Sequence, residues 1–385
     1  MGEPFLPFTK PCLNQAAIDE VVDCLNSGWL TTGPRVQQFE EALKTYLDAP
    51  YVLALNSATA GLQLALASLN LQPGDEVITT PLTFVATLNT IVIAGGMPVL
   101  VDIDPKTLNI DLNQLESKIN PKTRAIVPVH FAGLPVDLEI VYALAEKHNL
   151  RVIEDAAHAI GASFKEKKIG SFGDTQIFSF HPNKNMTTGE GGCLVTRDEK
   201  LARTASTLRF HGIDREVFNR FSAKGNHHYD VVAPGYKYNM LDLQAALGIH
   251  QLQQVDLFNN QRAERVRHYR EALSEWPQIT LPSEPHSDYG HAWHLFTILI
   301  HPETAGVSRD DFIQQMKSHQ IGTGFHYQSA HLYTFYRERF GFRPGDFPES
   351  EKISERIVSL PLFPHMTLQE QERVIQAMKS IFKIS

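Results

Sequence analysis

Residues 150–155 read Leu-Arg-Val-Ile-Glu-Asp, and residues 176–185 read Gln-Ile-Phe-Ser-Phe-His-Pro-Asn-Lys-Asn. Each stretch contains a short apolar run of the kind that predicts a buried strand. A charged residue follows each run: Asp155 ends the first, and Lys184 lies in the loop after the second. Because ligands of parallel sheets bind beyond the carboxyl ends of the strands, we expect Asp155 and Lys184 to lie at the functional edge of one sheet.

Apolar runs of this kind alternate with helical patterns over the first two-thirds of the chain. Several are continuous Val/Ile/Leu runs, which are typical of strands buried on both faces. The alternation predicts an α/β fold with a mostly parallel seven-stranded sheet and helices on both faces. The predicted strands cover residues 51–56, 76–80, 97–102, 124–130, 151–155, 176–180 and 192–196, and helices such as 60–69 and 138–148 lie between them.

A second, smaller unit is predicted after residue 255. A helical pattern leads to it, with one apolar face formed by Leu241, Ala245, Ile249, Leu252 and Val255. We expect residues 1–255 to form a large domain that carries Asp155 and Lys184, and residues 256–385 to form a smaller α+β domain. For the smaller domain we predict strands at 293–300 and 321–327, a helix that begins at Ser308, and a last helix opened by a capping box of Thr367 and Glu370.

The composition argues against several kinds of partner. The 385 residues carry a formal net charge of −8, which argues against a nucleic-acid surface or an anionic membrane as the main partner. No stretch approaches the length of a membrane span, and the first residues lack the pattern of a signal peptide. Cys12, Cys24 and Cys193 are odd in number and lack CxxC spacing, so we expect reduced thiols in a cytoplasmic protein.

Common cofactor and metal motifs are missing from the sequence. No GxGxxG follows a predicted strand, which argues against a nicotinamide cofactor, and neither GxxxxGK[ST] nor HExxH occurs. His227 and His228 have no ligand partners at metal spacing, so no metal site is predicted.

Asp155 and Lys184 instead suggest pyridoxal 5′-phosphate (PLP). A lysine amine can form a Schiff base with an aldehyde cofactor, and a carboxylate can keep a pyridine nitrogen protonated. PLP also needs an aromatic or imidazole face over its ring, for which Phe84 and His158 are candidates. It needs a phosphate cradle as well, for which the small residues at 56–61, including Thr59, and Ser179 are candidates. The large domain is therefore predicted to bind PLP.

Each of these residues, taken alone, has a plainer interpretation. Lys184 could be a solvated loop lysine, Asp155 the N-cap of a helix at 156–159, and His158 a structural residue of that helix. The Ser/Thr residues at 57–59 could form a simple N-cap, Ser179 could be an ordinary strand serine, and Phe84 could pack in the core. The PLP interpretation depends on their occurrence together.

Several motifs resemble the DegT/DnrJ/EryC1/StrS family of sugar aminotransferases. They are Glu-Asp-Ala-Ala-His-Ala at 154–159, Gly-Ser-Phe-Gly-Asp at 170–174, Phe-Ser-Phe-His-Pro-Asn-Lys-Asn at 178–185, Thr-Gly-Glu-Gly-Gly at 188–192 and the opening motif at 27–34. The resemblance runs from about residue 5 to the C-terminus. It implies PLP fold type I (aspartate aminotransferase-like) and a homodimer with active sites at the subunit interface.

The resemblance also implies roles for individual residues. Lys184 would be the Schiff-base lysine, Asp155 the partner of the pyridine nitrogen and His158 a ring-packing residue. Thr59, Ala60 and Ser179 would hold the phosphate, and Phe84 would stack on the ring. In the family, the segment at 235–239 reaches the phosphate site of the neighbouring subunit, and here it reads Gly-Tyr-Lys-Tyr-Asn. Many members have Gly-Tyr-Asn-Tyr-Arg, which leaves the choice between Lys237 and Asn239 open.

One branch of the family, which makes UDP-4-amino-4-deoxy-L-arabinose from a 4-keto-pentose, shares this variant and further motifs. These motifs are the segments 291–296, 322–324 and 359–364. Phe84 stands where that branch has Trp, and Pro182-Asn183 before the lysine also differs.

The resemblance implies an aminotransferase that moves an amino group from L-glutamate to a nucleotide-linked 4-keto-sugar, with a UDP-sugar as the preferred acceptor. The products would be 2-oxoglutarate and an amino sugar for modifying cell-surface polysaccharide, lipopolysaccharide or lipid, with pyridoxamine phosphate (PMP) as the intermediate form of the cofactor. Two alternatives stay open. One is a PLP-dependent sugar dehydratase, which has His in place of the lysine, and the other is a non-enzymatic regulator with the same fold.

Overall fold

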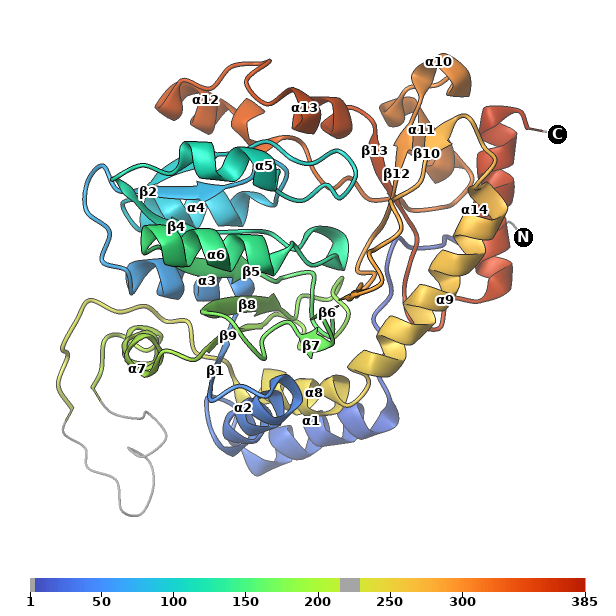
Figure 1. Cartoon of the computed structure of the whole chain (residues 1–385). Coiled ribbons are helices and arrows are strands. Elements are labelled where there is room, and N and C mark those ends of the chain that lie inside the picture. Colours follow the sequence, from blue (N-terminus) through green and yellow to red (C-terminus); the bar gives the residue numbers. More distant parts are fainter. Residues whose placement is uncertain (1–3, 215–228, 385) are drawn as a thin grey trace.

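The computed structural model describes residues 4–214 and 229–384, and a seven-stranded sheet lies at its centre (Figure 1). The strands follow the order β1-β9-β8-β5-β4-β2-β3, and their bounds are β1 (Tyr51–Leu55), β2 (Glu76–Thr79), β3 (Met97–Leu100), β4 (Thr123–Ile126), β5 (Arg151–Asp155), β8 (Thr175–Ser179) and β9 (Gly192–Thr196). Within this described sheet, β9 is antiparallel to both neighbours, whereas β3, β2, β4, β5 and β8 pair in parallel. The predicted seven strands and mostly parallel sheet are confirmed.

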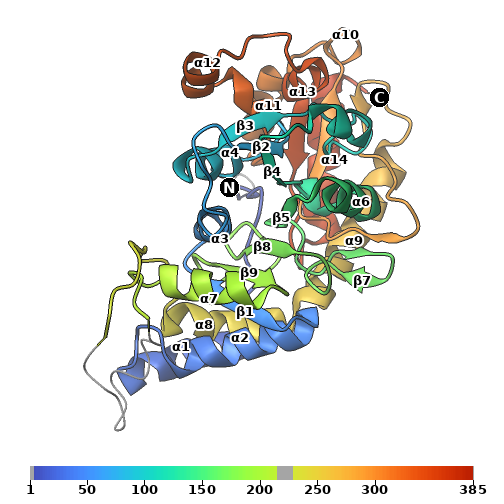
Figure 2. The same ribbon diagram turned by 60° about the vertical axis from the view of Figure 1, so that its left-hand side comes forward.

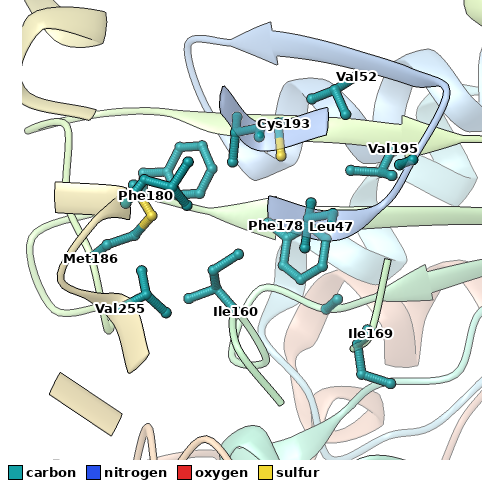
Figure 3. Packing of buried hydrophobic residues seen from close by; sticks show 14 of the residues in the cluster. Leu47, Val52, Ile160, Ile169, Phe178, Phe180, Met186, Cys193, Val195 and Val255 are labelled. Atoms are coloured by element: carbon teal, nitrogen blue, oxygen red, sulfur yellow. The ribbon is translucent and has the colours of Figure 1, made fainter. Parts of the chain in front are cut away.

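Helices cover both faces because successive strand side chains point to opposite sides of the sheet. Ile153 and Ile177 pack on one face in a cluster that includes residues of α3 (Ala58–Ala67) and α7 (Glu199–Leu208). Val152, next to Ile153, packs on the other face in a cluster with residues of α6 (Leu138–His148). Phe178, next to Ile177, joins a cluster that includes Leu47, Cys193 and Val255 (Figure 3).

Three helices form a layer beside the β1 end of the sheet (Figure 2). They are α1 (Gln15–Ser27), α2 (Pro34–Leu47) and α8 (Asp242–Leu252). The helical pattern predicted up to Val255 is interrupted after Leu252, and α9 (Val255–Leu273) begins there and leads away from the large sheet (Figure 1). The predicted domain boundary thus falls at the start of α9, and the division into two domains stays a prediction.

A small antiparallel sheet, in the order β10-β12-β13, forms the centre of the C-terminal α+β part. Its strands are β10 (Ile279–Thr280), β12 (Phe296–Ile300) and β13 (Ile357–Leu360), and α9, α11 (Arg309–Ser318) and α14 (Leu368–Phe382) contribute to the surrounding core. The helix starts predicted at Ser308 and Thr367 are confirmed. Ser308 caps α11, and Thr367 and Glu370 form the capping box of α14.

Two sequence expectations are wrong. Residues 321–327 form no strand, since Ile321 and Gly324 make only isolated bridges to Leu6 and Ser359, and the following residues turn toward a cavity. Residues 156–159 form a turn rather than a helix, so Asp155 is not a helix N-cap. Its carboxylate instead accepts a hydrogen bond from the Ala157 N–H within this turn (3.2 Å).

The remaining helices and strands are short. They are α4 (Val85–Ile93), α5 (Leu112–Leu115), α10 (Pro302–Ala305), α12 (Thr334–Phe340), α13 (Pro348–Ser354) and a sheet of β11 (Tyr289–Gly290), β6 (Ser163–Phe164) and β7 (Lys167–Lys168). Within residues 4–214 and 229–384, each helix is too short or too polar to cross a membrane.

Candidate active site

A cavity of about 840 Å³ lies beyond the carboxyl ends of β5 and β8, where α3 and α4 begin. Six of the residues selected from the sequence line it: Thr59, Phe84, Asp155, His158, Ser179 and Lys184. They come from strand ends, helix starts and loops spread over more than 100 residues of sequence. The fold therefore brings together the groups that the motifs suggested.

Asp155 is fixed at the base of the cavity. Its side chain accepts hydrogen bonds from the Thr87 hydroxyl (2.7 Å) and from the Ala157 N–H. Burial raises the pKa of Asp155 above its ordinary value, and these two hydrogen bonds and the Lys184 charge partly offset that rise. The ionised carboxylate is thus incompletely stabilised, and a cation placed next to it would be favoured.

Lys184 faces the same cavity with an amine that is easier to deprotonate than usual. Burial lowers the pKa of Lys184 to about 8, against an opposing effect of the Asp155 charge. Its Nζ lies 3.5 Å from Nε2 of His294. An amine with this pKa has a neutral fraction near neutral pH and can act as a nucleophile or base. Lys184 is therefore not a solvated loop lysine.

His158 is neutral and has a defined tautomer. Its Nδ1 accepts a hydrogen bond from the Ala132 N–H (3.2 Å), so the ring proton lies on Nε2 and is donated to the Tyr327 hydroxyl (3.1 Å). Burial lowers the pKa of His158 well below its ordinary value. The Tyr327 hydroxyl accepts this bond and keeps its own proton for another acceptor.

The start of α3 forms the polar end of the cavity. Ser57 is its N-cap and accepts a hydrogen bond from the Ala60 N–H (3.1 Å). The exposed side chain of Thr59 lines the cavity, whereas Ala60 is buried behind it. The Ser179 side chain faces the same space from the end of β8. A helix N-terminus with hydroxyl groups beside it suits a phosphate.

Phe84 is not a core residue, because 56% of its surface is exposed and its ring lies 6.0 Å from that of Tyr327. Asn239 lies elsewhere. Its amide donates to the Thr32 hydroxyl (2.6 Å), its carbonyl accepts from Lys237 Nζ (2.7 Å), and it lines a second cavity of about 390 Å³. The described chain by itself does not bring Asn239 to Lys184, and the role expected for it in a neighbouring subunit stays a prediction.

Sequence reasoning gave no role to four residues that lie next to these groups. They are Thr87, His294, His326 and Tyr327. His294 and Tyr327 occur in polar-aromatic runs, His-Ala-Trp-His at 291–294 and Phe-His-Tyr at 325–327, which are unusual in buried strands. That pattern was the available signal, but only the fold shows that the run at 325–327 lines the cavity and that His294 reaches Lys184.

No cluster of three or more His, Cys, Asp or Glu residues suited to a metal ion occurs in the part of the chain that the structure describes. His227 and His228 lie outside the described residues. The groups around the cavity fit PLP. They include an amine for its aldehyde, a buried carboxylate that favours a cation, an imidazole, an exposed phenyl ring and a helix start with hydroxyl groups.

The model of the DegT/DnrJ/EryC1/StrS aminotransferase family matches residues 11–379 of this chain. The chain belongs to this family. The spore coat polysaccharide biosynthesis protein SpsC of Bacillus subtilis is 44% identical to it, with 98% of this chain and 97% of SpsC covered.

Solved structures of the family have the same fold. Spr1654 of Streptococcus pneumoniae in its PMP form has a TM-score of 0.90 and 32% identity, with 99% of each chain covered, and a PLP form of Spr1654 matches as well. PseC of Helicobacter pylori, an aminotransferase involved in pseudoaminic acid biosynthesis, has a TM-score of 0.91 and 31% identity, with 98% of this chain and 99% of PseC covered. The expected PLP fold type I is confirmed, and this family member is a PLP-dependent sugar aminotransferase. That finding argues against the dehydratase and regulator alternatives.

Proposed function

We propose that this family member transfers the amino group of L-glutamate to the C4 ketone of a nucleotide-linked sugar, with a UDP-sugar as acceptor. The observation that carries the proposal is the convergence of the Lys184 amine and the Asp155 carboxylate on one cavity of about 840 Å³. That volume lies within the usual range for sites that enclose a small molecule and its cofactor. The preference for a UDP-linked 4-keto-sugar rests on the resemblance to the pentose branch.

In this proposal, Lys184 binds the aldehyde of PLP and Asp155 pairs with the ring nitrogen. His158 and Phe84 would pack against the ring, and Thr59, Ser179 and the backbone around Ala60 would hold the phosphate. The chemical fit supports these roles: Asp155 favours a cation, and α3 begins where the phosphate would lie. When bound, PLP stores the amino group and accepts electron density from the reacting carbon.

The residues of the chain would hold and move the protons. Lys184 would take a proton on Nζ and return it, which its pKa of about 8 allows near neutral pH. Asp155, in its ionised form, would stabilise positive charge on the ring nitrogen. His158 keeps its ring fixed between Ala132 and Tyr327. The sugar would enter past the partly exposed rings of Phe84, Phe325 and Tyr333 at the cavity edge.

The proposal includes a cytoplasmic homodimer. Lys237 and Asn239 would contact the phosphate site of the partner, since neither residue lines the Lys184 cavity of its own chain. The exposed row of Ile18, Val22 and Leu25 on α1 offers apolar surface for a second copy. The name of SpsC, which refers to spore coat polysaccharide, supports a role in cell-surface polysaccharide modification.

The first test is the visible absorption spectrum of the PLP-loaded protein before and after addition of L-glutamate without sugar. We expect the band of lysine-bound PLP to be replaced by that of PMP, and ¹⁵N from labelled glutamate to appear in the cofactor. A band that ignores glutamate but responds to another amino acid would reject the donor, and Lys184→Ala should show no such band.

A second test offers the PMP-loaded protein to a matched panel of keto-sugars. UDP-4-keto-pentose, UDP-4-keto-hexose and dTDP-4-keto-hexose separate the effect of the nucleotide from that of the sugar. We expect the UDP-sugars to restore the lysine-bound band fastest. A dTDP-sugar that reacts more than tenfold faster would reject the UDP assignment while leaving the aminotransferase intact.

A further inference from the structure

The buried imidazole of His294 lies within hydrogen-bonding distance of the Lys184 amine. Its Nε2 lies 3.5 Å from Lys184 Nζ, and only 2% of His294 is exposed. The His158 and His294 rings lie against each other, with centroids 4.3 Å apart and an interplanar angle of 44°. Because the nitrogens of His158 bond to Ala132 and Tyr327, His158 offers His294 a ring contact rather than a hydrogen bond.

The main chain of His294 is held on both sides. Its N–H donates to the Ala132 carbonyl (2.9 Å), and its carbonyl accepts from Nη1 of Arg262 (3.2 Å). Arg262, with 1% of its surface exposed, also donates to the Leu362 carbonyl (2.9 Å). Gly133 packs against this segment, and a Cβ at Gly133 would lie 3.2 Å from the backbone nitrogen of His294. The backbone that carries the imidazole is therefore fixed beside the lysine.

The surroundings of His294 keep it neutral. Burial is the largest cause of its lowered pKa, and the charges of Lys184 and Arg262 act in the same direction. Among the described residues, Nδ1 of His294 has no hydrogen-bond partner. A neutral ring with its proton on Nδ1 has a free lone pair on Nε2. In that tautomer, the lone pair of Nε2 faces the lysine amine at 3.5 Å and can accept its hydrogen bond.

We propose that His294 is the hydrogen-bond acceptor that orients the Lys184 amine and stabilises its protonated form, and that Arg262 is a positioning residue acting through the His294 backbone. The inference rests on the proposed function, in which Lys184 reacts with PLP. An acceptor stabilises the ammonium form over the neutral amine, so removing it lowers the pH at which Lys184 becomes reactive. Removal of the acceptor also lets the Lys184 amine adopt other orientations.

The test uses the full chain stripped of cofactor. The rate of PLP capture is followed by growth of the visible band between pH 5.5 and 10. In His294→Phe, which keeps a ring against His158, we expect the midpoint of the rate profile to fall by about one pH unit, the size of one charge-assisted hydrogen bond. His291→Phe, three residues earlier with its ring stacked on Trp293, should keep the wild-type midpoint. An unchanged midpoint in folded His294→Phe overturns the inference.

A second pair of variants covers the case in which His294→Phe does not fold. His294→Gln keeps an acceptor with the reach of Nε2, whereas His294→Asn is one methylene shorter. We expect the wild-type midpoint for Gln and the lowered midpoint for Asn, and equal midpoints overturn the inference. Arg262→Lys should lower the midpoint as His294→Asn does, but by less. A wild-type midpoint in Arg262→Lys would remove Arg262 from the proposal.

Lys184→Ala distinguishes failure of the proposed function from failure of the His294 inference. If this variant captures PLP with the wild-type band, the proposed function fails whatever His294 does. If it shows no band while the His294 variants keep the wild-type profile, the proposed function survives and the His294 inference fails.

Discussion

The Thr87 hydroxyl and the Asp155 carboxylate lie 2.7 Å apart in the buried base of the cavity, although 68 residues separate them in sequence. Thr87 belongs to the first turn of α4 and Asp155 ends β5, so the hydrogen bond joins a helix start to a strand end. The hydroxyl oxygens of Thr83 and Thr87 lie 2.9 Å apart and form a hydrogen bond. This arrangement fixes the carboxylate before any cofactor binds.

Asp155→Asn should therefore bind PLP but react slowly. Asn keeps the shape and can still accept from Thr87, but it cannot balance a positive ring nitrogen. We expect the single-turnover rate with glutamate to fall about 100- to 1000-fold, while the dissociation constant for PLP changes less than tenfold. Thr87→Val, which removes only the supporting hydrogen bond, should lower the same single-turnover rate about tenfold. An Asp155→Asn rate within tenfold of wild type would contradict the assignment.

The reactivity of Lys184 should follow pH with a midpoint near 8, because only the neutral amine attacks an aldehyde and burial lowers its pKa to about 8. Capture of PLP by the cofactor-free protein should thus accelerate as the pH rises from 6 to 9 and then level off. Stopped-flow absorbance measures it. In Asp155→Asn the midpoint should fall further, because the Asp155 charge raises the pKa of Lys184. A wild-type midpoint near 10.5 would refute the perturbed amine.

Two phenylalanines should respond in opposite ways to truncation. Phe84 is 56% exposed at the cavity edge, whereas Phe178, on strand β8, is fully buried in the hydrophobic core. We expect Phe84→Ala to change the free energy of unfolding by less than about 0.5 kcal/mol and to weaken PLP binding about tenfold. Phe178→Ala should lower the free energy of unfolding by about 3–5 kcal/mol. Urea titration and equilibrium dialysis measure both. Loss of stability in Phe84→Ala would restore the core interpretation.

Gly133 and Gly345 offer a matched pair, since both have a φ of 95°. A Cβ at Gly133 would lie 2.9 Å from the His158 carbonyl oxygen, whereas nothing lies within 4 Å of one at Gly345. We expect Gly345→Ala to lower the free energy of unfolding by about 1 kcal/mol through backbone strain alone. Gly133→Ala should lower it by about 1–3 kcal/mol more, because the added Cβ overpacks its surroundings. Gly133→Ala should also weaken PLP capture, because Gly133 packs behind His158 and His294. An equal loss of unfolding free energy in the two variants would contradict this expectation, because the neighbours of Gly133 would then accommodate the added Cβ without cost.

The fold was largely predictable because its elements depend on local chemistry. The runs that became β1, β5 and β9 are short and apolar, and strands buried on both faces require this. Ser308 and Thr367 mark helix starts because their side chains satisfy backbone N–H groups only three residues away. The strand prediction for 321–327 fails for a related reason: the apolar and aromatic residues of the segment suit a strand, but Phe325, His326 and Tyr327 line the cavity.

Motifs and apolar runs are local, so the sequence predicts the seven strands and the α/β class and marks Asp155 and Lys184 as candidate residues. The contacts of Thr87 with Asp155, of Tyr327 with His158 and of His294 with Lys184 follow from the tertiary structure. These contacts join residues 68 to 169 positions apart. Hydrogen bonds act over about 3 Å and burial depends on every neighbouring element, so no local pattern contains them.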